Sequence, residues 1–179
     1  MLNIEDSLVL IIDVQEKLVS AVSENEIVSK VSKLAEATNL LNIPVIVTEQ
    51  YPKGLGNSVT QLSSRFGGNA KIFEKTYFNA LSEECILQYL DTLGKKQVVL
   101  CGIETHICVY QTASALLEMG YEVYVLKDAC ASRNTFEYES GIELMRDSGA
   151  KISCLEIVLF EWLKGAKNPK FKEIQALIK

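Results

Sequence analysis

The sequence predicts an α/β fold in which helices cover both faces of a parallel sheet. Short apolar runs that suit buried strands alternate along the chain with longer segments that suit helices. In such sheets, ligands bind beyond the carboxyl ends of the strands, where the strand order reverses. The runs expected to be strands are 8–12, 43–47, 71–75, 97–101, 122–126 and 151–155.

The amino-acid composition favours a single globular domain and argues against nucleic-acid and membrane partners. The 179 residues are 48% hydrophobic and 23% charged, which suits one globular domain spanning residues 1–179. The net charge of −5, without a basic cluster, argues against a nucleic-acid partner. No apolar run has membrane-spanning length, and the first residues, MLNIEDSLVL, lack the features of a signal peptide. We therefore expect a cytoplasmic protein without a membrane partner.

The segments between the strands carry helix signals. The segment 24–41 places apolar side chains on one helical face. Ser82 suits the N-cap of a helix over 82–93, and Pro169 suits the first turn of a terminal helix over 169–178. Two further helices are expected over 105–119 and 135–148, and polar loops over 48–58 and 129–134.

Cysteine and histidine usage limits the chemistry. The five cysteines, an odd number without paired spacing, suit reduced thiols. His106 is the only histidine, which excludes zinc sites with two or more histidines. Its spacing of two residues from Cys108 puts the two side chains on different faces of a helix, so His106 is expected at the rim or in a structural role. We expect no metal and no cofactor.

Three reactive residues fall at the carboxyl ends of predicted strands. Cys108 lies in the first turn of a helix, where the thiolate is favoured, although a buried core cysteine is an equal alternative. Asp13 follows the first strand, where a cap or turn residue is the alternative. Lys75 ends the third predicted strand, where the alternative is a solvated surface residue, the more common role of a single lysine. Their convergence on one edge of the sheet favours a joint functional role.

The motifs LIIDVQ, FEKTYF and GIETHICV, which contain these residues, resemble those of the isochorismatase-like cysteine hydrolases. The resemblance spans nearly the whole chain. VTEQYPKGLG, LCGIETHICVYQTA, KDACASR and NPKFKEIQ are similar to the isochorismatase-domain-containing branch, whose substrates are mostly undefined. The resemblance implies a catalytic triad of Asp13, Lys75 and Cys108. It also implies a three-layer α/β/α fold with a six-stranded, mainly parallel sheet of order 3-2-1-4-5-6.

The same resemblance implies further features of the site. A cis peptide is expected at Ile103–Glu104, aiming the backbone N–H groups of Glu104 and Cys108 at an oxyanion. Nicotinamidases of this family bind a metal through the loop after the second strand, but here Gln50 and Pro52 take the places of the ligands. A metal-dependent nicotinamidase is therefore disfavoured.

The resulting hypothesis is a thiol-dependent hydrolase of a small carbonyl compound, with amides among the candidates. Asp13 would take the proton of Cys108, and Lys75 would keep Asp13 ionised and favour the thiolate. We expect Cys108 to be the most acidic thiol. The alternative is a non-catalytic binding or scaffold protein. Isochorismate hydrolysis is suggested by the family name only.

The remaining predictions concern the pocket and the assembly. The predicted substrate pocket comprises Gln15, Tyr51, Tyr77, Phe78 and Thr105, although core packing is the alternative for Tyr77 and Phe78. Cys130 follows a strand end and is a further candidate for the lining, whereas Cys85, Cys101 and Cys154 are expected to pack internally. Apolar residues near the carboxyl terminus exceed what one small sheet needs and predict a homo-oligomer: Phe160, Trp162, Leu163, Phe171, Ile174 and Leu177.

Overall fold

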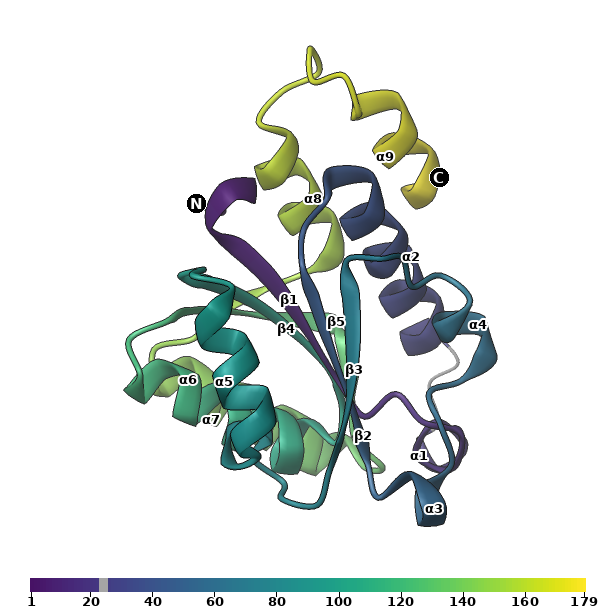
Figure 1. The fold of residues 1–179 in the computed structure, drawn as a ribbon, viewed down its shortest axis with the longest axis vertical. Coiled ribbons are helices and arrows are strands. Elements are labelled where there is room, and N and C mark those ends of the chain that lie inside the picture. Colours follow the sequence, from purple (N-terminus) through teal and green to yellow (C-terminus); the bar gives the residue numbers. More distant parts are fainter. Residues whose placement is uncertain (23–25) are drawn as a thin grey trace.

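The computed structural model describes residues 1–22 and 26–179. Its strands form one six-stranded parallel sheet in the order β3-β2-β1-β4-β5-β6, which confirms the predicted fold class and strand order (Figure 1). The strands are Ser7–Ile12 (β1), Val45–Gln50 (β2), Ala70–Lys75 (β3), Gln97–Ile103 (β4), Glu122–Ala131 (β5) and Lys151–Ser153 (β6).

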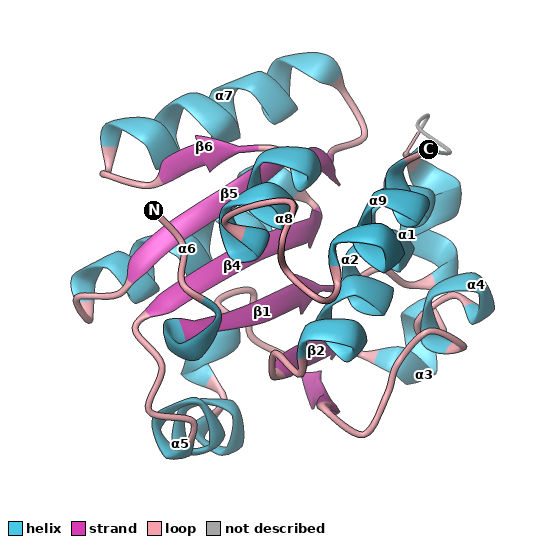
Figure 2. Cartoon of the chain, turned by 90° about the horizontal axis from the view of Figure 1, so that it is seen from above, coloured by secondary structure: helices cyan, strands magenta, loops and turns pink. Residues whose placement is uncertain are grey.

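Helices cover both faces of this sheet. One face carries α5, α6 and α7, and the other carries α2, α8 and α9 (Figures 1 and 2). The short helices α1 and α3 lie together beyond the carboxyl ends of β1 and β2 (Figure 1). The helices are Glu16–Ala21 (α1), Glu26–Leu41 (α2), Pro52–Leu55 (α3), Thr60–Ser63 (α4), Glu84–Thr92 (α5), Tyr110–Glu118 (α6), Thr135–Asp147 (α7), Leu155–Leu163 (α8) and Phe171–Ile178 (α9), with 3-10 turns Ile4–Asp6 (η1) and Ala80–Ser82 (η2) and a π-helical turn Thr105–Val109 (η3).

The two central strands fix the position of the site. Every residue of β1 and β4 is buried, as expected of strands covered on both faces. They pair in register from Ser7 opposite Gln97 to Ile12 opposite Gly102. The sheet order reverses between them, so the residues that follow β1 and β4 meet at the switch point.

The fifth strand is longer than predicted. Its pairing with β4 shifts between Leu100 and Gly102, and the chain rejoins the ladder at Cys130 and Ala131. Asp128, within the shift, instead accepts a hydrogen bond from the Leu155 N–H at 2.9 Å and forms an ion pair with Lys30 at 3.2 Å. The predicted loop 129–134 was therefore wrong in its first half, because the interruption is local and the strand continues past it.

Other boundaries differ for identifiable reasons. The second strand begins at Val45, since the Ile43 N–H still closes α2 by donating to the Thr38 carbonyl at 2.9 Å. It continues to Gln50, inside the expected loop. Ser82 ends η2 and is not the N-cap of α5, a place taken by Glu83. The expected start of the helix at Glu24 lies outside the described residues.

Helix α8 was not assigned from the sequence, and it changes the argument for an oligomer. Its segment LEIVLFEWL is apolar almost throughout, so it has no polar face to mark a helix. Trp162 and Leu163, together with Ile174 of α9, are buried within the chain. These three residues therefore do not provide a surface for self-association, whereas Phe160 stays 38% exposed.

Candidate active site

Asp13 is wholly buried directly after β1. Its backbone has φ +53°, a left-handed conformation that Asp tolerates better than most residues. Thr48 of β2 fixes it twice: the Thr48 hydroxyl donates to Asp13 Oδ1 at 2.6 Å, and the Asp13 N–H donates to the Thr48 carbonyl at 3.1 Å. The carboxylate is thus held at the switch point by the neighbouring strand.

Lys75, the last residue of β3, points into the molecule rather than into solvent. Its side chain is 0% exposed, and Nζ lies 2.7 Å from Asp13 Oδ2. The ammonium also donates to Gln50 Oε1 at 2.6 Å and to the Tyr77 carbonyl at 3.2 Å. A buried ammonium needs such partners for its three protons. Lys75 therefore forms a fully buried ion pair with Asp13.

Two glutamines hold this lysine in place. Gln50 Nε2 donates to the Thr76 carbonyl at 2.8 Å, which turns Gln50 Oε1 toward Lys75. Gln15, also fully buried, clamps the backbone of Gln50, because its amide accepts from the Gln50 N–H at 2.7 Å and donates to the Gln50 carbonyl at 3.0 Å. The amide of Gln15 thus bonds to the backbone around the site, although the sequence suggested that it would line the pocket.

A sharp turn after β4 places Cys108 at the carboxyl edge of the sheet. Gly102 has φ +137°, and a Cβ there would overlap the Ile12 carbonyl oxygen, so only glycine allows β4 to approach β1 this closely. The expected cis peptide at Ile103–Glu104 is wrong for this structure, which has no cis peptide among the described residues. The chain turns instead through Gly102 and the π-helical η3, in which the N–H groups of Ile107 and Val109 both donate to the Glu104 carbonyl at 3.1 and 3.3 Å.

The thiol of Cys108 lies beside the Asp13–Lys75 pair and is only 6% exposed. Burial, and after it the negative charge of Asp13, raises the pKa of Cys108 to about 12, although the charge of Lys75 acts in the opposite direction. The expectation of an unusually acidic Cys108 is therefore wrong for the resting protein. The favourable effects of Lys75 and a helix N-terminus are outweighed by desolvation and by a close carboxylate.

A cavity of about 360 Å³ opens onto the thiol, within the size range of small-molecule sites. Most of its surface is apolar. Phe78 is the one member of the predicted substrate pocket that lines it. The lining residues are Asp13, Lys17, Leu18, Ala21, Gln50, Leu55, Phe78, Ile103, Glu104, Ile107, Cys108 and Arg133.

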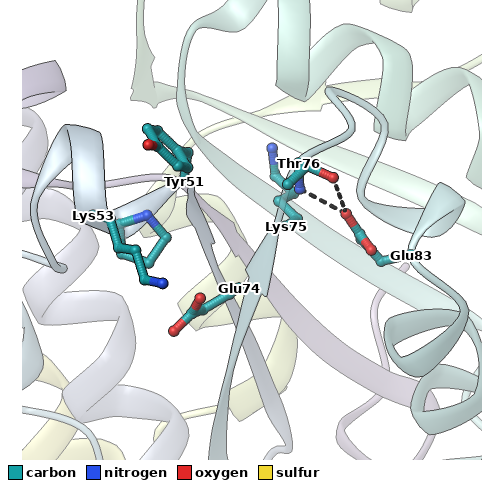
Figure 3. Close-up of a pocket in the computed structure, with 7 residues that line it drawn as sticks. Tyr51, Lys53, Glu74, Lys75, Thr76 and Glu83 are labelled. Carbon is teal, nitrogen blue, oxygen red and sulfur yellow. Dashed lines mark hydrogen bonds between the residues drawn. The ribbon is translucent and has the colours of Figure 1, made fainter.

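The other predicted pocket residues lie elsewhere. Tyr51 faces a second hollow of about 220 Å³, shared with Lys53 and Glu74 at the ends of β2 and β3 (Figure 3). Tyr77 is 57% exposed and lines neither hollow. Thr105 is buried at the first position of η3, where its N–H donates to Ser132 Oγ at 3.1 Å. Cys130 is buried in the sheet and is not part of the lining.

Glu83, which lines the second hollow, fixes the segment that follows β3. Its Oε1 accepts hydrogen bonds from the N–H groups of Thr76 and Tyr77 at 2.6 and 3.3 Å, and the dashed lines in Figure 3 mark its two bonds to Thr76. These bonds, that from the Thr76 N–H foremost, lower the pKa of Glu83. They fix the segment whose Tyr77 carbonyl accepts from Lys75.

The sequence reasoning missed the charges of three lining residues, although it had assigned the backbone of one of them, Glu104, to the site. Glu104 Oε1 accepts from Arg133 Nε at 2.7 Å, with side-chain exposures of 9% and 58%. Lys17 Nζ donates to the Gly54 carbonyl at 2.7 Å. Arg133 ends the motif KDACASR, and its position just past β5, at the same edge of the sheet, was the available signal.

His106 belongs to this outer region. Its Nδ1 lies 3.0 Å from Ser132 Oγ and 3.5 Å from Glu104 Oε2. The histidine is therefore placed to support the rim, in agreement with its expected structural role.

The donor set gives little basis for a metal centre. Within residues 1–22 and 26–179, no group of three or more His, Cys, Asp or Glu side chains is arranged to hold a metal ion. At the end of β2, where the metal ligands of nicotinamidases were expected, Gln50 Oε1 accepts a hydrogen bond from Lys75. Over the same described ranges, no helix combines the length and apolarity that crossing a bilayer requires.

Sequence comparisons identify relatives along most of the chain. A model of the isochorismatase domain matches residues 7–157. Isochorismatase domain-containing protein 2 of Xenopus laevis is 41% identical over 173 residues, which cover 96% of this chain and 83% of that protein.

Solved structures of similar proteins have the same fold. A Caenorhabditis elegans protein described as the MAR1 ribonuclease superposes with a TM-score of 0.93 at 40% identity, covering 99% of this chain and 91% of that one. YcaC of Escherichia coli, described as an octameric hydrolase of unknown specificity, gives 0.92 at 26% identity, with coverages of 99% and 88%. YcaC of Pseudomonas aeruginosa, solved with hexane-2,5-diol and covalent acrylamide, gives 0.91 at 28% identity, with coverages of 98% and 90%.

Proposed function

The chain belongs to the isochorismatase domain family, and we propose that it is a thiol-dependent hydrolase of small carbonyl compounds, with amides as the first class to test. One observation carries the proposal. The Cys108 thiol shares an apolar cavity with the Asp13 carboxylate, and Thr48 and Lys75 hold that carboxylate in place. This is the arrangement of a nucleophile beside its base.

The first half of the reaction forms an acyl-enzyme. Because the pKa of Cys108 is raised to about 12, the resting thiol is protonated at neutral pH. Asp13 takes its proton as the sulfur attacks the carbonyl carbon, so a C–S bond forms and the carbonyl oxygen becomes an oxyanion. The tetrahedral intermediate then expels the amine, which receives the proton from Asp13, and a thioester remains on Cys108.

The second half of the reaction regenerates the free thiol of Cys108. Asp13 accepts a proton from water as the water oxygen attacks the thioester carbon. The second tetrahedral intermediate expels the sulfur, which regains the proton, and the carboxylic acid leaves. Lys75 Nζ, 2.7 Å from Asp13 Oδ2, holds the carboxylate in position for each proton transfer.

The developing oxyanion needs donors near the sulfur. We assign this role to the backbone N–H groups of Glu104 and Cys108, since both residues line the cavity, the first just before η3 and the second within it. The helix-like turn directs the positive ends of its peptide dipoles to the same place.

Relatives support hydrolysis and a reactive thiol. YcaC of Escherichia coli is described as a hydrolase. Acrylamide is an electrophile that adds to thiolates, and the Pseudomonas aeruginosa YcaC carries it covalently. Phosphodiester cleavage, suggested by the description of the worm relative, has weaker support here, because most of the surface of the cavity is apolar.

The test is turnover of a panel of small amides and esters, followed by amine or acid release and by mass spectrometry of the quenched protein. We expect an acyl adduct on Cys108 and loss of turnover in Cys108→Ala, whereas Cys85→Ala, which removes an exposed thiol, retains it. Turnover that survives in Cys108→Ala would overturn the assignment. Specific binding of panel compounds without any adduct would favour the alternative, a non-catalytic binding protein. Cleavage of RNA is measured in parallel, as the test of phosphodiester cleavage.

We also propose that the protein self-associates. Ile157 and Phe160 of α8 are 53% and 38% exposed beside the chain start, around a hollow of about 620 Å³. The octameric description of the Escherichia coli relative supports an assembly. Light scattering at micromolar concentration should give a mass above 19.9 kDa, and a monomer would refute the proposal.

A further inference from the structure

We propose that Arg133 forms an anion-binding subsite at the mouth of the Cys108 cavity, and that the substrate is a small, mainly apolar compound carrying one carboxylate. This inference rests on the proposed hydrolase function for the reaction, but the subsite is defined by its own contacts. It names the chemical class of compound that the cavity accepts.

The first argument is the orientation of the guanidinium. Arg133 lines the cavity and its side chain is 58% exposed, so the group is accessible to a ligand. Its Nε is fixed by Glu104, a carboxylate that is 9% exposed. A guanidinium held through Nε keeps the donors of its two Nη atoms, which suit a carboxylate. The buried glutamate therefore presents the arginine in a defined direction.

The second argument is the charge around the cavity. Asp13 is balanced by Lys75, and Glu104 by Arg133. Lys17, which lines the cavity, donates to the neutral carbonyl of Gly54. When Lys75 is counted beside them, the two carboxylates of the lining are matched by three positive side chains, in a chain whose net charge is −5. Such a field favours an anion and disfavours a cation.

The third argument is the apolar body of the cavity. Behind the charged mouth, the surface comes mainly from aliphatic and aromatic side chains, which contribute no charge and favour hydrocarbon groups. These residues are Leu18, Ala21, Leu55, Phe78, Ile103 and Ile107. A compound with an apolar middle, a carbonyl near Cys108 and a carboxylate at Arg133 matches all three features.

The test uses two thiol reagents that react identically but differ in charge. Iodoacetate carries a carboxylate and iodoacetamide does not, and both alkylate sulfur by displacing iodide. The rate at each cysteine of the full-length protein is followed by peptide mass spectrometry at low ionic strength, where charge effects are least screened. Cys85, exposed on α5, reports the intrinsic difference between the reagents in the same tube.

We expect Arg133→Gln to lower the iodoacetate-to-iodoacetamide rate ratio at Cys108, relative to that at Cys85, by about fivefold, the size expected of one partly exposed ion pair. Arg133→Lys should lie between Arg133→Gln and the unmodified protein. The matched control is Lys53→Gln, which removes an exposed positive charge on α3 outside the cavity and should leave the ratio unchanged. An unchanged ratio in Arg133→Gln would overturn the subsite.

A binding measurement separates this inference from the hydrolase proposal. In a Cys108→Ala background, calorimetry compares 4-methylpentanoate with 4-methylpentanamide. The acid should bind more tightly, and Arg133→Gln should reduce that preference by about fivefold. Equal affinities would overturn the subsite even if Cys108 is reactive. A preference for the acid that depends on Arg133 would support the subsite even if no substrate is turned over.

Discussion

The site contains two ion pairs that have the same chemistry but different surroundings. Lys75 and Asp13 are both 0% exposed and lie 2.7 Å apart, with Asp13 lining the cavity. Arg133 and Glu104 have the same separation of 2.7 Å, but Arg133 is 58% exposed at the mouth. Both side chains of the inner pair are buried, so neither charge can be removed without leaving the other uncompensated. The outer pair is solvated on one side, so its energetic contribution is small.

This contrast suggests a division of roles. The inner pair is tied to the reacting atoms and to the stability of the fold at once, because its charges are buried with the thiol. The outer pair contributes little to folding, which leaves Arg133 available to interact with a ligand. The predictions below test this division, in order of decreasing expected effect.

Breaking the inner pair should have the largest effect. Lys75→Met leaves Asp13 buried and unpaired, which should lower the free energy of unfolding by about 3–5 kcal/mol. Chemical denaturation measures this value, with the exposed Lys53→Met as a control that should stay within about 0.5 kcal/mol of the unmodified protein.

The double variant Lys75→Met/Asp13→Asn sharpens the same test. It removes both charges, so it should be more stable than Lys75→Met alone. A double variant less stable than Lys75→Met would mean that the loss arises from packing rather than from the unpaired carboxylate.

Removing the glutamine that holds Lys75 should have an intermediate effect. Gln50→Ala deletes a hydrogen bond to a charged group, which should cost about 1.5–3 kcal/mol in the free energy of unfolding. Gln61→Ala, at an exposed position of α4, is the matched control. Equal stability of the two variants would show that Gln50 does not hold the lysine.

The outer pair should contribute little to stability. Arg133→Gln should change the free energy of unfolding by less than about 1 kcal/mol, since the arginine is more than half exposed. A loss as large as that of Lys75→Met in the same denaturation experiment would abolish the distinction between the two pairs.

Metal removal should have no effect. Gln50 binds Lys75 where metal-dependent relatives were expected to have ligands, so chelation should leave the melting temperature and any activity unchanged. Elemental analysis of untagged protein gives the check, and a stoichiometric metal ion would contradict the prediction.

The sequence could predict the sheet and the convergence of the three reactive residues because both follow from local pattern. Asp13, Lys75 and Cys108 each come at or soon after the end of an apolar run, and parallel strands bring those ends together. No ligand and no distant contact is needed for that inference.

The rest depends on contacts between distant segments. The role of Gln15 was missed because its partners lie 35 and 41 residues along the chain. The pKa of Cys108 was predicted in the wrong direction because it depends on how burial and two opposite charges balance, which only the packed structure determines. Helix α8 was missed because an almost wholly apolar segment carries no periodicity.

The central claim is that Asp13 takes the proton of Cys108 as the sulfur attacks, and the pH dependence of iodoacetamide labelling at Cys108 tests it most directly. Transfer of the proton from sulfur to Asp13 changes no proton count, so the reactive form should be equally populated from pH 6 to pH 9, well below the pKa of about 12 for loss of the thiol proton to solvent. We predict a flat labelling rate at Cys108 over this range, while labelling of the exposed Cys85 rises with pH, because the thiolate is the nucleophile. A rate at Cys108 that rises in parallel with that at Cys85 would contradict the account, because the thiol would then lose its proton to solvent without Asp13.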